Sequence, residues 1–519
     1  MSNKTLANLL DVGKHHNKHK TAIDDGKTQY SFAELDILSD RLATTLRKRY
    51  GLRKGDKILV IPSKCSQLIV SILSIWKCGA VYVPVDKNNG VNRIEFIKNN
   101  ISAALSISDL QTLDDLSDIL KDIPNFVYEN VNLLEADVDN INFEEATAED
   151  VAVILHTSGS EGVPKGVMLQ HCSIISYFNA HNQILDFNTT SKNLNFGDFH
   201  FDVSIQDTFL PLFFGGSVYL FKGLFLSKLI IDLLVEQQVS HIIAVSSVLS
   251  LITGNGSEIE RLRETPLRVC MTGGEVCDIK LINKWLTILP NLRLYNGYGP
   301  TECNSLTMAY HIMEPDYNRN TLFPIGTPFD KMEAILLDKN HQLISAVNTK
   351  GILAISGPQI MKGYLNLPLQ NKQVLKKIGG KTFYITGDFA RKDEDGNYHF
   401  EGRNDSEVKI QGRRINLNEI RNCLLNVSTI DYVVVDTIKL EKGTFIYSFL
   451  HGTNLQLDTI LKDVLEQSRT CLPDYMIPKY LYISSWISKT STNKVNEKGI
   501  KEIIQNRIQK NSNKYIVVE

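Results

Sequence analysis

The chain alternates short apolar segments with amphipathic ones over most of its length, and this alternation constrains the fold more than any other feature. One unit places an apolar segment at residues 57–61, a helical pattern at 67–77 and a second apolar segment at 81–85. Another runs from residues 229–238 into the apolar segment 241–245. Repeated strand, helix and strand segments are typical of parallel sheets connected by helices. The pattern predicts an α/β fold with largely parallel sheets.

The pattern changes from residue 351 onwards. Apolar segments such as 351–355 are then separated by tight turns, which predicts a β-rich module. After this module the sequence indicates a small α+β domain. We place the boundary at Asp405, so that residues 1–404 form a large domain of α/β subdomains plus the β-rich module, and residues 405–519 form a small C-terminal domain.

Composition argues against several classes of function. The chain has 519 residues with 56 basic and 58 acidic side chains, so its net charge of -2 gives no reason to expect a nucleic acid or an anionic membrane as main partner. The most apolar stretch, residues 68–85, is interrupted by Ser71, Ser74 and Lys77 and is too polar for a membrane span. The 8 cysteines form no C-x-x-C pairs, and the first residues do not resemble a signal peptide. We expect a cytoplasmic protein.

A glycine- and hydroxyl-rich loop follows the apolar segment 151–155. Residues 156–166 read HTSGSEGVPKG. Glycines let the backbone approach a polyphosphate, N–H and O–H groups bind its oxygens, and Lys165 offsets its charge. The loop is not a P-loop, because Pro164 precedes the lysine. On its own such a loop is more often a surface turn, so the interpretation depends on the rest of the sequence.

Further motifs accompany this loop in a fixed order. They are FDVS at residues 201–204, NGYGPTE at 296–302, YITGD at 384–388, GRND at 402–405 with Lys409, and NKV at 493–495. Together they resemble the adenylate-forming enzymes, which are the acyl-CoA synthetases, the luciferases and the adenylation domains of nonribosomal peptide synthetases. Within this superfamily the chain looks most like a free-standing amino-acid adenylation enzyme.

The resemblance implies roles for residues that would bind ATP and Mg2+. Tyr298 would present a flat face to adenine, Asp388 would accept hydrogen bonds from the ribose hydroxyls, and Arg403 would hold ribose or phosphate. Thr301 would meet the α-phosphate, and Glu302 would bind the magnesium ion that bridges phosphate oxygens. The residues implied to bind the nucleotide are Thr157, Ser158, Gly159, Ser160, Lys165, Gly274, Glu275, Asn296, Tyr298, Asp388 and Arg403.

The resemblance also implies a catalytic lysine on a mobile C-terminal domain. Lys494 would enter the site and bridge the substrate carboxylate and phosphate oxygens, as a compact cation that stabilises charge. Asp405 resembles the family's hinge, whose rotation exchanges an adenylating surface for a thioester-forming one, and Lys409 is the matching residue on that second surface. One active site would thus run two half-reactions by domain motion.

Asp202 indicates the class of substrate. In the amino-acid branch of the family an aspartate here pairs with the α-ammonium group, which penalises acids without that amine. The pocket would be lined by Asp202, Val203, Gln206, Ile243, Met271, Gly273, Gly297, Ser305 and Leu306 and closed by Lys494. Apart from Asp202 and Lys494 these residues are uncharged, which predicts a neutral amino acid.

The first three residues of the predicted lining, Asp202, Val203 and Gln206, resemble those of pockets that accept proline or pipecolate. Gly273 and Gly297, however, would leave room that proline does not fill. We favour proline, with small or branched aliphatic amino acids next. Since no carrier segment follows Lys494, we expect transfer to the phosphopantetheine thiol of a separate carrier protein.

Two departures from the family pattern leave alternatives open. Ser160 and Glu161 replace two threonines of the usual phosphate loop, and the final motif reads NKVN at residues 493–496 in place of Gly-Lys-x-Asp. Glu161 adds a negative charge near the leaving pyrophosphate and would favour a non-catalytic descendant that only binds its ligands. A coenzyme A ligase of the same fold is the other alternative, and Asp202 argues against it.

Overall fold

The computed structural model describes residues 5–133, 144–158, 163–254, 257–403, 407–440, 443–452, 457–484, 487–488, 495–510 and 515–518. The chain forms two compact units. Unit 1 comprises Met1–Val85, Asn100–His156 and Gly166–Asn404, and unit 2 comprises Asp86–Asn99, Thr157–Lys165 and Asp405–Glu519. Asn404, Asp405 and Ser406 lie outside the described residues, so the hinge stays a prediction.

A seven-stranded sheet has the order β19-β8-β7-β4-β3-β5-β6. Its strands are β3 (Lys57–Val60), β4 (Val81–Pro84), β5 (Leu105–Ser108), β6 (Asn125–Val127), β7 (Val151–Thr157), β8 (Lys165–Gln170) and β19 (Gly363–Tyr364). β3 pairs with β4 and β5 in parallel. Between β3 and β4 runs α3 (Ser66–Lys77), whose residues are nearly all buried, including Ser71 and Ser74, whose hydroxyls donate to backbone carbonyls of the same helix. The predicted strand–helix–strand unit is confirmed.

A nine-stranded sheet, ordered β15-β14-β13-β12-β11-β9-β10-β1-β2, forms the second layer of unit 1. Its strands are β1 (Thr21–Asp24), β2 (Gln29–Ser31), β9 (Lys192–Asn195), β10 (Ser217–Leu220), β11 (His241–Ile243), β12 (Val269–Gly273), β13 (Arg293–Tyr298), β14 (Met308–Ile312) and β15 (Thr327–Pro328). β10, β9, β11, β12 and β13 are parallel neighbours. The carboxyl ends of these strands therefore meet along one edge, where an open α/β sheet places its ligand site.

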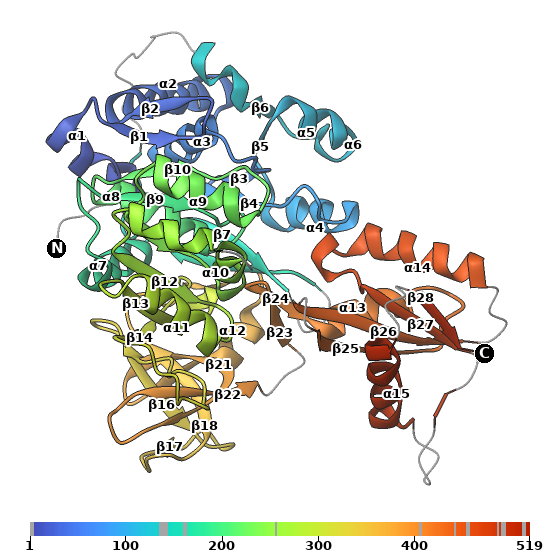
Figure 1. The fold of residues 1–519 in the computed structure, drawn as a ribbon. Helices are drawn as coiled ribbons and strands as arrows, with labels where there is room; N and C mark the ends of the chain where they lie inside the picture. The colour runs from blue at the N-terminus through green and yellow to red at the C-terminus, as the bar shows by residue number, and fades with distance from the viewer. Residues whose placement is uncertain are drawn as a thin grey trace. The chain divides into compact units, whose positions relative to one another are not determined.

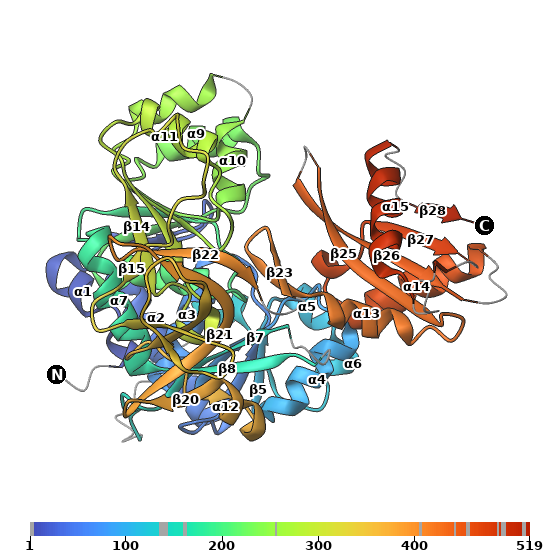
Figure 2. The ribbon, with the colours of Figure 1, turned by 90° about the horizontal axis from the view of Figure 1, so that it is seen from below.

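Helices accompany this sheet (Figure 1). They are α7 (His171–Leu185), the π-helix η3 (Ile205–Phe209), α8 (Leu210–Phe213), α9 (Ser227–Glu236), α10 (Ser246–Thr253), η4 (Glu258–Glu264), α11 (Ile279–Ile288) and the short 3₁₀ helix η5 (Thr301–Cys303). In Figure 2, α9, α10 and α11 lie beside one another, and their buried side chains, among them the fully buried Trp285, belong to a separate apolar core.

The β-rich module is an antiparallel sheet, β17-β16-β18-β21-β20, with β22 paired to β21. The strands are β16 (Glu333–Leu337), β17 (Leu343–Ile344), β18 (Gly351–Ser356), β20 (Leu375–Ile378), β21 (Lys381–Lys392) and β22 (Tyr398–Arg403), with α12 (Pro368–Val374) between β19 and β20. The sequence predicted this module only from residue 351. It begins earlier, at Glu333, because β16 is the antiparallel partner of β18.

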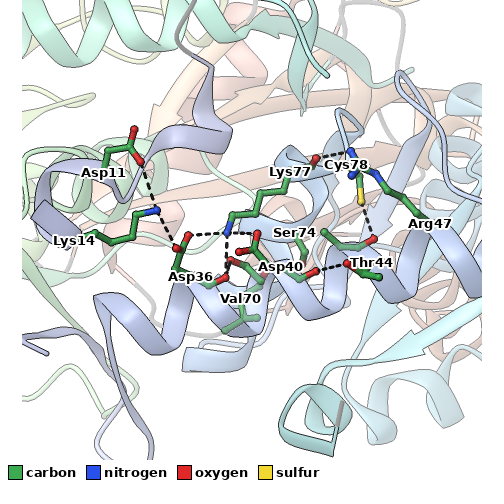
Figure 3. Close-up of polar contacts among 12 residues, drawn as sticks. Asp11, Lys14, Asp36, Asp40, Thr44, Arg47, Val70, Ser74, Lys77 and Cys78 are labelled. Carbon is green, nitrogen blue, oxygen red and sulfur yellow. Dashed lines mark hydrogen bonds and ion pairs between the residues drawn. The ribbon is translucent and has the colours of Figure 1, made fainter. Parts of the chain in front are cut away.

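A charged network ties the N-terminal helices of unit 1 together (Figure 3). It joins α1 (Asp11–Asn17), α2 (Phe32–Tyr50) and α3. Lys77 Nζ donates to Asp36 Oδ1 at 2.8 Å and to Asp40 Oδ1 at 2.7 Å, while Lys14 Nζ donates to Asp36 Oδ2 at 2.9 Å. A capping box formed by Ser31 and Glu34 starts α2. Asp36 thus connects all of these helices through a lysine on either side.

Unit 2 contains a four-stranded sheet, β25-β26-β27-β28, and the hairpin β23-β24. The elements are β23 (Glu407–Ile410), β24 (Arg413–Asn416), α13 (Leu417–Leu425), β25 (Tyr432–Leu440), β26 (Gly443–His451), α14 (Leu457–Cys471), η6 (Asp474–Met476), β27 (Tyr480–Ser484), α15 (Glu497–Lys510) and β28 (Tyr515–Val518). The predicted small α+β fold is confirmed.

The remaining described elements are η1 (Leu6–Asn8), α4 (Val91–Ile101), α5 (Leu110–Asp115), α6 (Ser117–Leu120) and η2 (Tyr128–Leu133). A search of the described helices finds none with the length and apolar character needed to cross a membrane.

Candidate functional site

The carboxyl edge of the parallel strands in unit 1 gathers many of the predicted site residues. Asp202 follows β9, Met271 and Gly273 end β12, and Gly297 and Tyr298 end β13. β12 and β13 are in register, with Gly273 opposite Gly297. Residues from distant parts of the sequence therefore reach one edge because their strands are parallel neighbours.

The predicted ammonium-binding and α-phosphate-binding residues contact each other. Thr301 Oγ1 donates a hydrogen bond of 2.6 Å to Asp202 Oδ2. Asp202 lies in the turn before the π-helix η3, and Thr301 begins η5. A hydroxyl bound to a carboxylate forms a charge-assisted hydrogen bond, which fixes the orientation of the carboxylate.

The predicted adenine- and ribose-binding residues form a second cluster. Tyr298 OH donates to Asp388 Oδ2, and Arg403 Nη1 donates to Asp388 Oδ1 at 2.5 Å. Asp388 and Arg403 are also cross-strand partners on β21 and β22. Burial and the neighbouring carboxylate hold the pKa of Tyr298 well above its ordinary value, so it stays a neutral donor. Each oxygen of Asp388 keeps acceptor capacity for a hydroxyl of a bound sugar.

Glu302 is fully buried. Its Oε1 accepts a 2.6 Å hydrogen bond from Tyr364 OH, and its carbonyl oxygen accepts one of 2.7 Å from the Met361 N–H. No cluster of three or more metal-ligating side chains occurs in the part of the chain that the structure describes. A single oriented carboxylate fits Mg2+, which usually takes one or two protein carboxylates and completes its shell with phosphate oxygens and water.

A buried histidine joins two residues of the predicted amino-acid pocket. Gln206 Nε2 lies 2.8 Å from His181 Nδ1, and His181 Nε2 lies 3.1 Å from the carbonyl oxygen of Leu306. All three side chains are buried, and burial lowers the pKa of His181 to about 3. The imidazole is therefore neutral at physiological pH and can bridge the π-helix and the loop that follows η5.

The space beside the two pocket glycines is occupied by Leu306. A Cβ atom on Gly297 would lie 2.8 Å from Leu306 Cδ1 and 3.0 Å from Met271 Sδ, and one on Gly273 would lie 3.2 Å from Leu306 Cδ2. The room that the sequence predicts beside these glycines is therefore limited, by the Gly297 carbonyl and Leu306 at Gly273 and by Leu306 and Met271 at Gly297. Ile243 is buried at the end of the neighbouring β11.

Other predicted site residues of unit 1 make structural contacts. Glu275 Oε2 accepts from the Ser247 N–H at 2.9 Å in the first turn of α10, and Asn296 Nδ2 donates to the Pro324 carbonyl at 2.7 Å. Ser305 has a left-handed backbone with φ of 76°, which turns the chain out of η5. Two predicted site residues of unit 1 remain: Gly274, whose backbone has a positive φ, and Val203, which is partly exposed.

The remaining predictions fall in unit 2 or outside the described residues. Ser158 Oγ donates to the Arg414 carbonyl at 3.1 Å, and Lys409 lies on β23, opposite Arg414 on β24. Thr157 and Lys165 flank the phosphate loop at the end of β7 and the start of β8. Gly159, Ser160, Glu161 and Lys494 lie outside the described residues, so their roles stay predictions.

Sequence reasoning missed a buried carboxylate, Asp207, on the π-helix that follows Asp202. Asp207 Oδ2 accepts from the N–H groups of Phe196 and Gly197 at 3.0 and 2.8 Å, and Oδ1 accepts from Asn195 Nδ2 at 2.7 Å. Burial raises the pKa of Asp207 to about 6. Lys64 Nζ donates to the Phe196 carbonyl at 2.8 Å on the same segment. No motif signals these contacts, since they depend on how the segment between β9 and η3 folds back and, for Lys64, join residues 132 positions apart.

Comparisons with known proteins agree with this geometry. A family model described as AMP-binding enzyme matches residues 11–365. Bacitracin synthase 3 from Bacillus licheniformis is 30% identical over 510 residues, covering 96% of this chain and 8% of that protein. Tyrocidine synthase 3 from Brevibacillus parabrevis is 28% identical over 507 residues, covering 96% of this chain and 8% of that protein. The chain thus spans only a small part of the length of these relatives.

Solved structures share the fold over nearly the whole chain. Holo-PA1221, an NRPS protein containing adenylation and PCP domains, has a TM-score of 0.84 at 21% identity, covering 97% of this chain and 84% of that one. The artificially fused adenylation–PCP protein NpsA-ThdA from Klebsiella oxytoca has a TM-score of 0.81 at 21% identity, covering 98% of each chain. With the family match, these similarities lead to one conclusion: the chain belongs to the AMP-binding, adenylate-forming enzyme family, as an adenylation domain of the nonribosomal peptide synthetase type.

Proposed function

We propose that this chain activates a neutral amino acid with ATP, releases pyrophosphate, and then transfers the aminoacyl group to the phosphopantetheine thiol of a separate carrier protein. The observation that carries the proposal is the hydrogen bond of 2.6 Å from Thr301 to Asp202. It brings the group that would bind the α-phosphate next to the group that would bind the α-ammonium. The amino-acid carboxylate would then lie where its oxygen can attack the α-phosphorus.

In the first half-reaction, a carboxylate oxygen of the amino acid forms a bond to the α-phosphorus, and the bond from that phosphorus to the bridging oxygen of pyrophosphate breaks. Both reactants are anions, so the site must position them and offset the charge that develops. Thr301 would turn its one hydroxyl proton from Asp202 to the α-phosphate as the substrates bind, and Lys494 would bridge carboxylate and phosphate oxygens. A magnesium ion on Glu302 would offset the charge of the phosphates.

The nucleoside would be held by the cluster around Asp388. Its carboxylate is already oriented by Tyr298 OH and by Arg403 Nη1 at 2.5 Å, so it is positioned before a ribose arrives. A carboxylate fixed by two donors loses little conformational freedom when it accepts further hydrogen bonds. The Tyr298 ring would lie against adenine. This arrangement supports a nucleotide with an unmodified ribose as the co-substrate.

The pocket geometry supports a compact neutral amino acid. Leu306 lies beside Gly273 and Gly297 and limits the room there, which weakens the objection to proline raised by the sequence. Gln206 and Met271 are uncharged and fully buried, so a charged substrate side chain would find no counter-ion in either of them. We therefore keep proline or pipecolate as the proposed substrate, with small aliphatic amino acids next.

The second half-reaction would use the thioester-forming surface of the small domain, with Lys409 upon it and rotation about Asp405. The thiol sulfur of the carrier would attack the aminoacyl carbonyl, and AMP would leave. Two structural relatives carry adenylation and PCP domains in one chain, which supports a carrier protein as partner. We propose the cytoplasm as the site of this reaction, where ATP is abundant.

Amino-acid-dependent ATP–pyrophosphate exchange tests the proposal. The panel contains the common amino acids, pipecolate and acids without an amine. We expect a maximum at proline or pipecolate, and loss of it in Asp202→Asn, while ATP binding by calorimetry is unchanged. Asp186→Asn is the matched control, because Asp186 is exposed with a left-handed backbone that asparagine tolerates.

Each outcome of this assay is informative. Exchange only with acids lacking an amine would replace the proposal by acid–coenzyme A ligation. Nucleotide binding without any exchange would favour a non-catalytic protein. A maximum at a different neutral amino acid would preserve the reaction and reject proline.

A further inference from the structure

His181 is a buried titratable residue that the proposed reaction does not use. It lies on α7 (Figure 1), and it was absent from the predicted pocket. Its ring centroid lies 4.0 Å from that of Tyr177 and 4.1 Å from that of Phe329, so aromatic side chains on two sides hold the ring in place. Its two nitrogens face residues that do belong to the predicted pocket.

The protonation of this imidazole follows from its partners. The Leu306 carbonyl oxygen can only accept, so His181 Nε2 must carry the proton of their 3.1 Å hydrogen bond. The ring is neutral at physiological pH, since burial lowers its pKa to about 3. Nδ1 is then an acceptor, and the partner at 2.8 Å must be the amide nitrogen of Gln206.

This hydrogen bond fixes which end of the Gln206 amide faces His181. If the amide rotated by half a turn, its carbonyl oxygen would meet the lone pair of Nδ1, which is repulsive. Gln206 Oε1 consequently points away from the imidazole. It is buried and has no hydrogen-bond partner among the described residues. An unpaired buried acceptor favours a ligand that brings a donor to it.

The same imidazole also fixes the Leu306 backbone. The Leu306 side chain packs beside Gly273 and Gly297, so the position of this backbone determines how far the leucine extends into the pocket. His181, although outside the predicted pocket, thereby orients the Gln206 amide and holds the Leu306 backbone, two parts of its predicted lining.

We infer that His181 is a specificity-positioning residue of this adenylation domain, which fixes the Gln206 amide with its oxygen toward the substrate side chain and sets the position of Leu306. The inference rests on the proposed function, in which Gln206 and Leu306 line the amino-acid pocket. It has a consequence that can be measured with isosteric substrates. Threonine and valine have the same shape, but only threonine brings a donor, so threonine should be used better by roughly 10-fold.

The decisive variant is His181→Phe, which keeps the ring between Tyr177 and Phe329 and removes both hydrogen bonds. ATP–pyrophosphate exchange is measured for threonine, valine, proline and leucine, with KM for each amino acid and for ATP. We expect the threonine-to-valine ratio to fall to within about 2-fold, because the freed amide can rotate. The KM for leucine should fall relative to that for proline, while the KM for ATP stays unchanged.

Two further variants separate the two contacts. In His181→Asn the amide oxygen replaces Nδ1 as the acceptor for Gln206, so the threonine-to-valine ratio should survive while selection by size weakens. In His181→Gln the amide nitrogen replaces Nε2 as the donor to Leu306, so selection by size should survive while the threonine-to-valine ratio falls. These variants also preserve the test if His181→Phe does not fold.

The matched control is His241→Phe. His241 is equally buried, its Nε2 lies 3.0 Å from the Leu185 carbonyl oxygen, its Nδ1 lies 2.8 Å from Ser240 Oγ, and its ring stacks on Phe187. The control variant should lose thermal stability without changing any ratio of amino-acid substrates. A general loss of folding would affect both variants alike.

The possible failures can be told apart. A wild-type protein that exchanges with no amino acid rejects the proposed function. A wild-type protein that exchanges with an amino acid but uses threonine and valine equally rejects the inference alone. The inference is also overturned if His181→Phe reproduces the wild-type ratios, or if His241→Phe shifts them as strongly.

Discussion

Thr301 donates a hydrogen bond of 2.6 Å to the carboxylate of Asp202. The two residues lie 99 positions apart and come from different strand ends of one sheet. In the proposed reaction Asp202 binds the amine of one substrate and Thr301 binds the phosphate of the other. A change at Thr301 should therefore affect the use of both substrates, whereas a change at Asp202 should affect the amino acid.

Thr301→Val removes the hydroxyl and keeps the side-chain shape. We expect kcat/KM for the amino acid in pyrophosphate exchange to fall by about 10- to 100-fold, because valine lacks the hydroxyl proton that Thr301 donates to Asp202 in this structure and would donate to the phosphate when ATP is bound. Thr301→Ser retains the hydroxyl and should stay near wild type. If Thr301→Val changed only the KM for ATP, the contact with Asp202 would have no part in amino-acid binding.

Leu306→Ala should enlarge the amino-acid pocket, because the leucine fills the space beside Gly273 and Gly297. We expect exchange with leucine or phenylalanine to rise relative to proline by roughly 10-fold. Gly297→Ala placed in the Leu306→Ala background should partly reverse this shift, since the new Cβ then has room. Unchanged preference in Leu306→Ala would show that this side chain does not limit the pocket.

Lys494→Ala should reduce the rate of pyrophosphate exchange by about 100- to 1000-fold, which is typical for removal of a group that stabilises charge in the transition state. ATP binding, measured by calorimetry, should remain. Lys498→Ala is the control, because Lys498 is an exposed lysine of the following helix. Equal losses in both variants would contradict a specific role for Lys494.

Acid should destabilise the fold through its buried histidines. Burial lowers the pKa to about 4 for His171 and to about 3 for His181 and His241, from an ordinary 6.5. Between pH 6.5 and these values the unfolded chain binds more protons than the folded one, so the free energy of unfolding falls as pH falls. At pH 5 each histidine accounts for about 2 kcal/mol.

Chemical denaturation at pH 7 and pH 5 checks this expectation. In His241→Gln the loss between the two pH values should shrink by about 2 kcal/mol. His16→Gln, at an exposed position, should reproduce the wild-type pH dependence. A wild-type protein whose stability rose toward pH 5 would contradict the neutral state of these histidines.

Lys77→Met should loosen the packing of α2 on α3. The ammonium group of Lys77 donates to Asp36 Oδ1 at 2.8 Å and to Asp40 Oδ1 at 2.7 Å, and methionine fills similar volume without either bond. We expect a loss of about 1–3 kcal/mol in the free energy of unfolding, measured by denaturant titration. Lys18→Met, at an exposed position, should have little effect. Equal stability of Lys77→Met and wild type would show that the network does not hold these helices.

Local sequence patterns were sufficient to predict the framework. Residues 67–77 fall within α3, as their helical pattern of apolar residues predicted. The start of the β-rich module was missed. Its first strand, β16, is defined by pairing with β18 across the loop between them, and such pairing leaves no local signal.

The site was predictable only in part, and for the same reason. Motifs indicated that Thr301 and Asp202 serve one site, but not that they contact each other. Gly273 and Gly297 suggested room that proline would not fill, because sequence does not show that Leu306 lies against Gly297. His181 lies on a helix with an ordinary apolar pattern, and only the three-dimensional arrangement shows that it contacts Gln206.

The pairing of the first strands limits how this domain can be cut and joined. β1 is the parallel neighbour of β10, and β2 is the outermost strand on that side of the sheet, whose strands carry the predicted amino-acid pocket at their carboxyl ends. A chimaeric synthetase that takes only residues from β9 onward would expose the backbone of β10 as an open edge, which invites aggregation. Exchange of substrate specificity by transplantation should therefore keep residues 21–31 with the graft, or leave the host's own first hairpin in place.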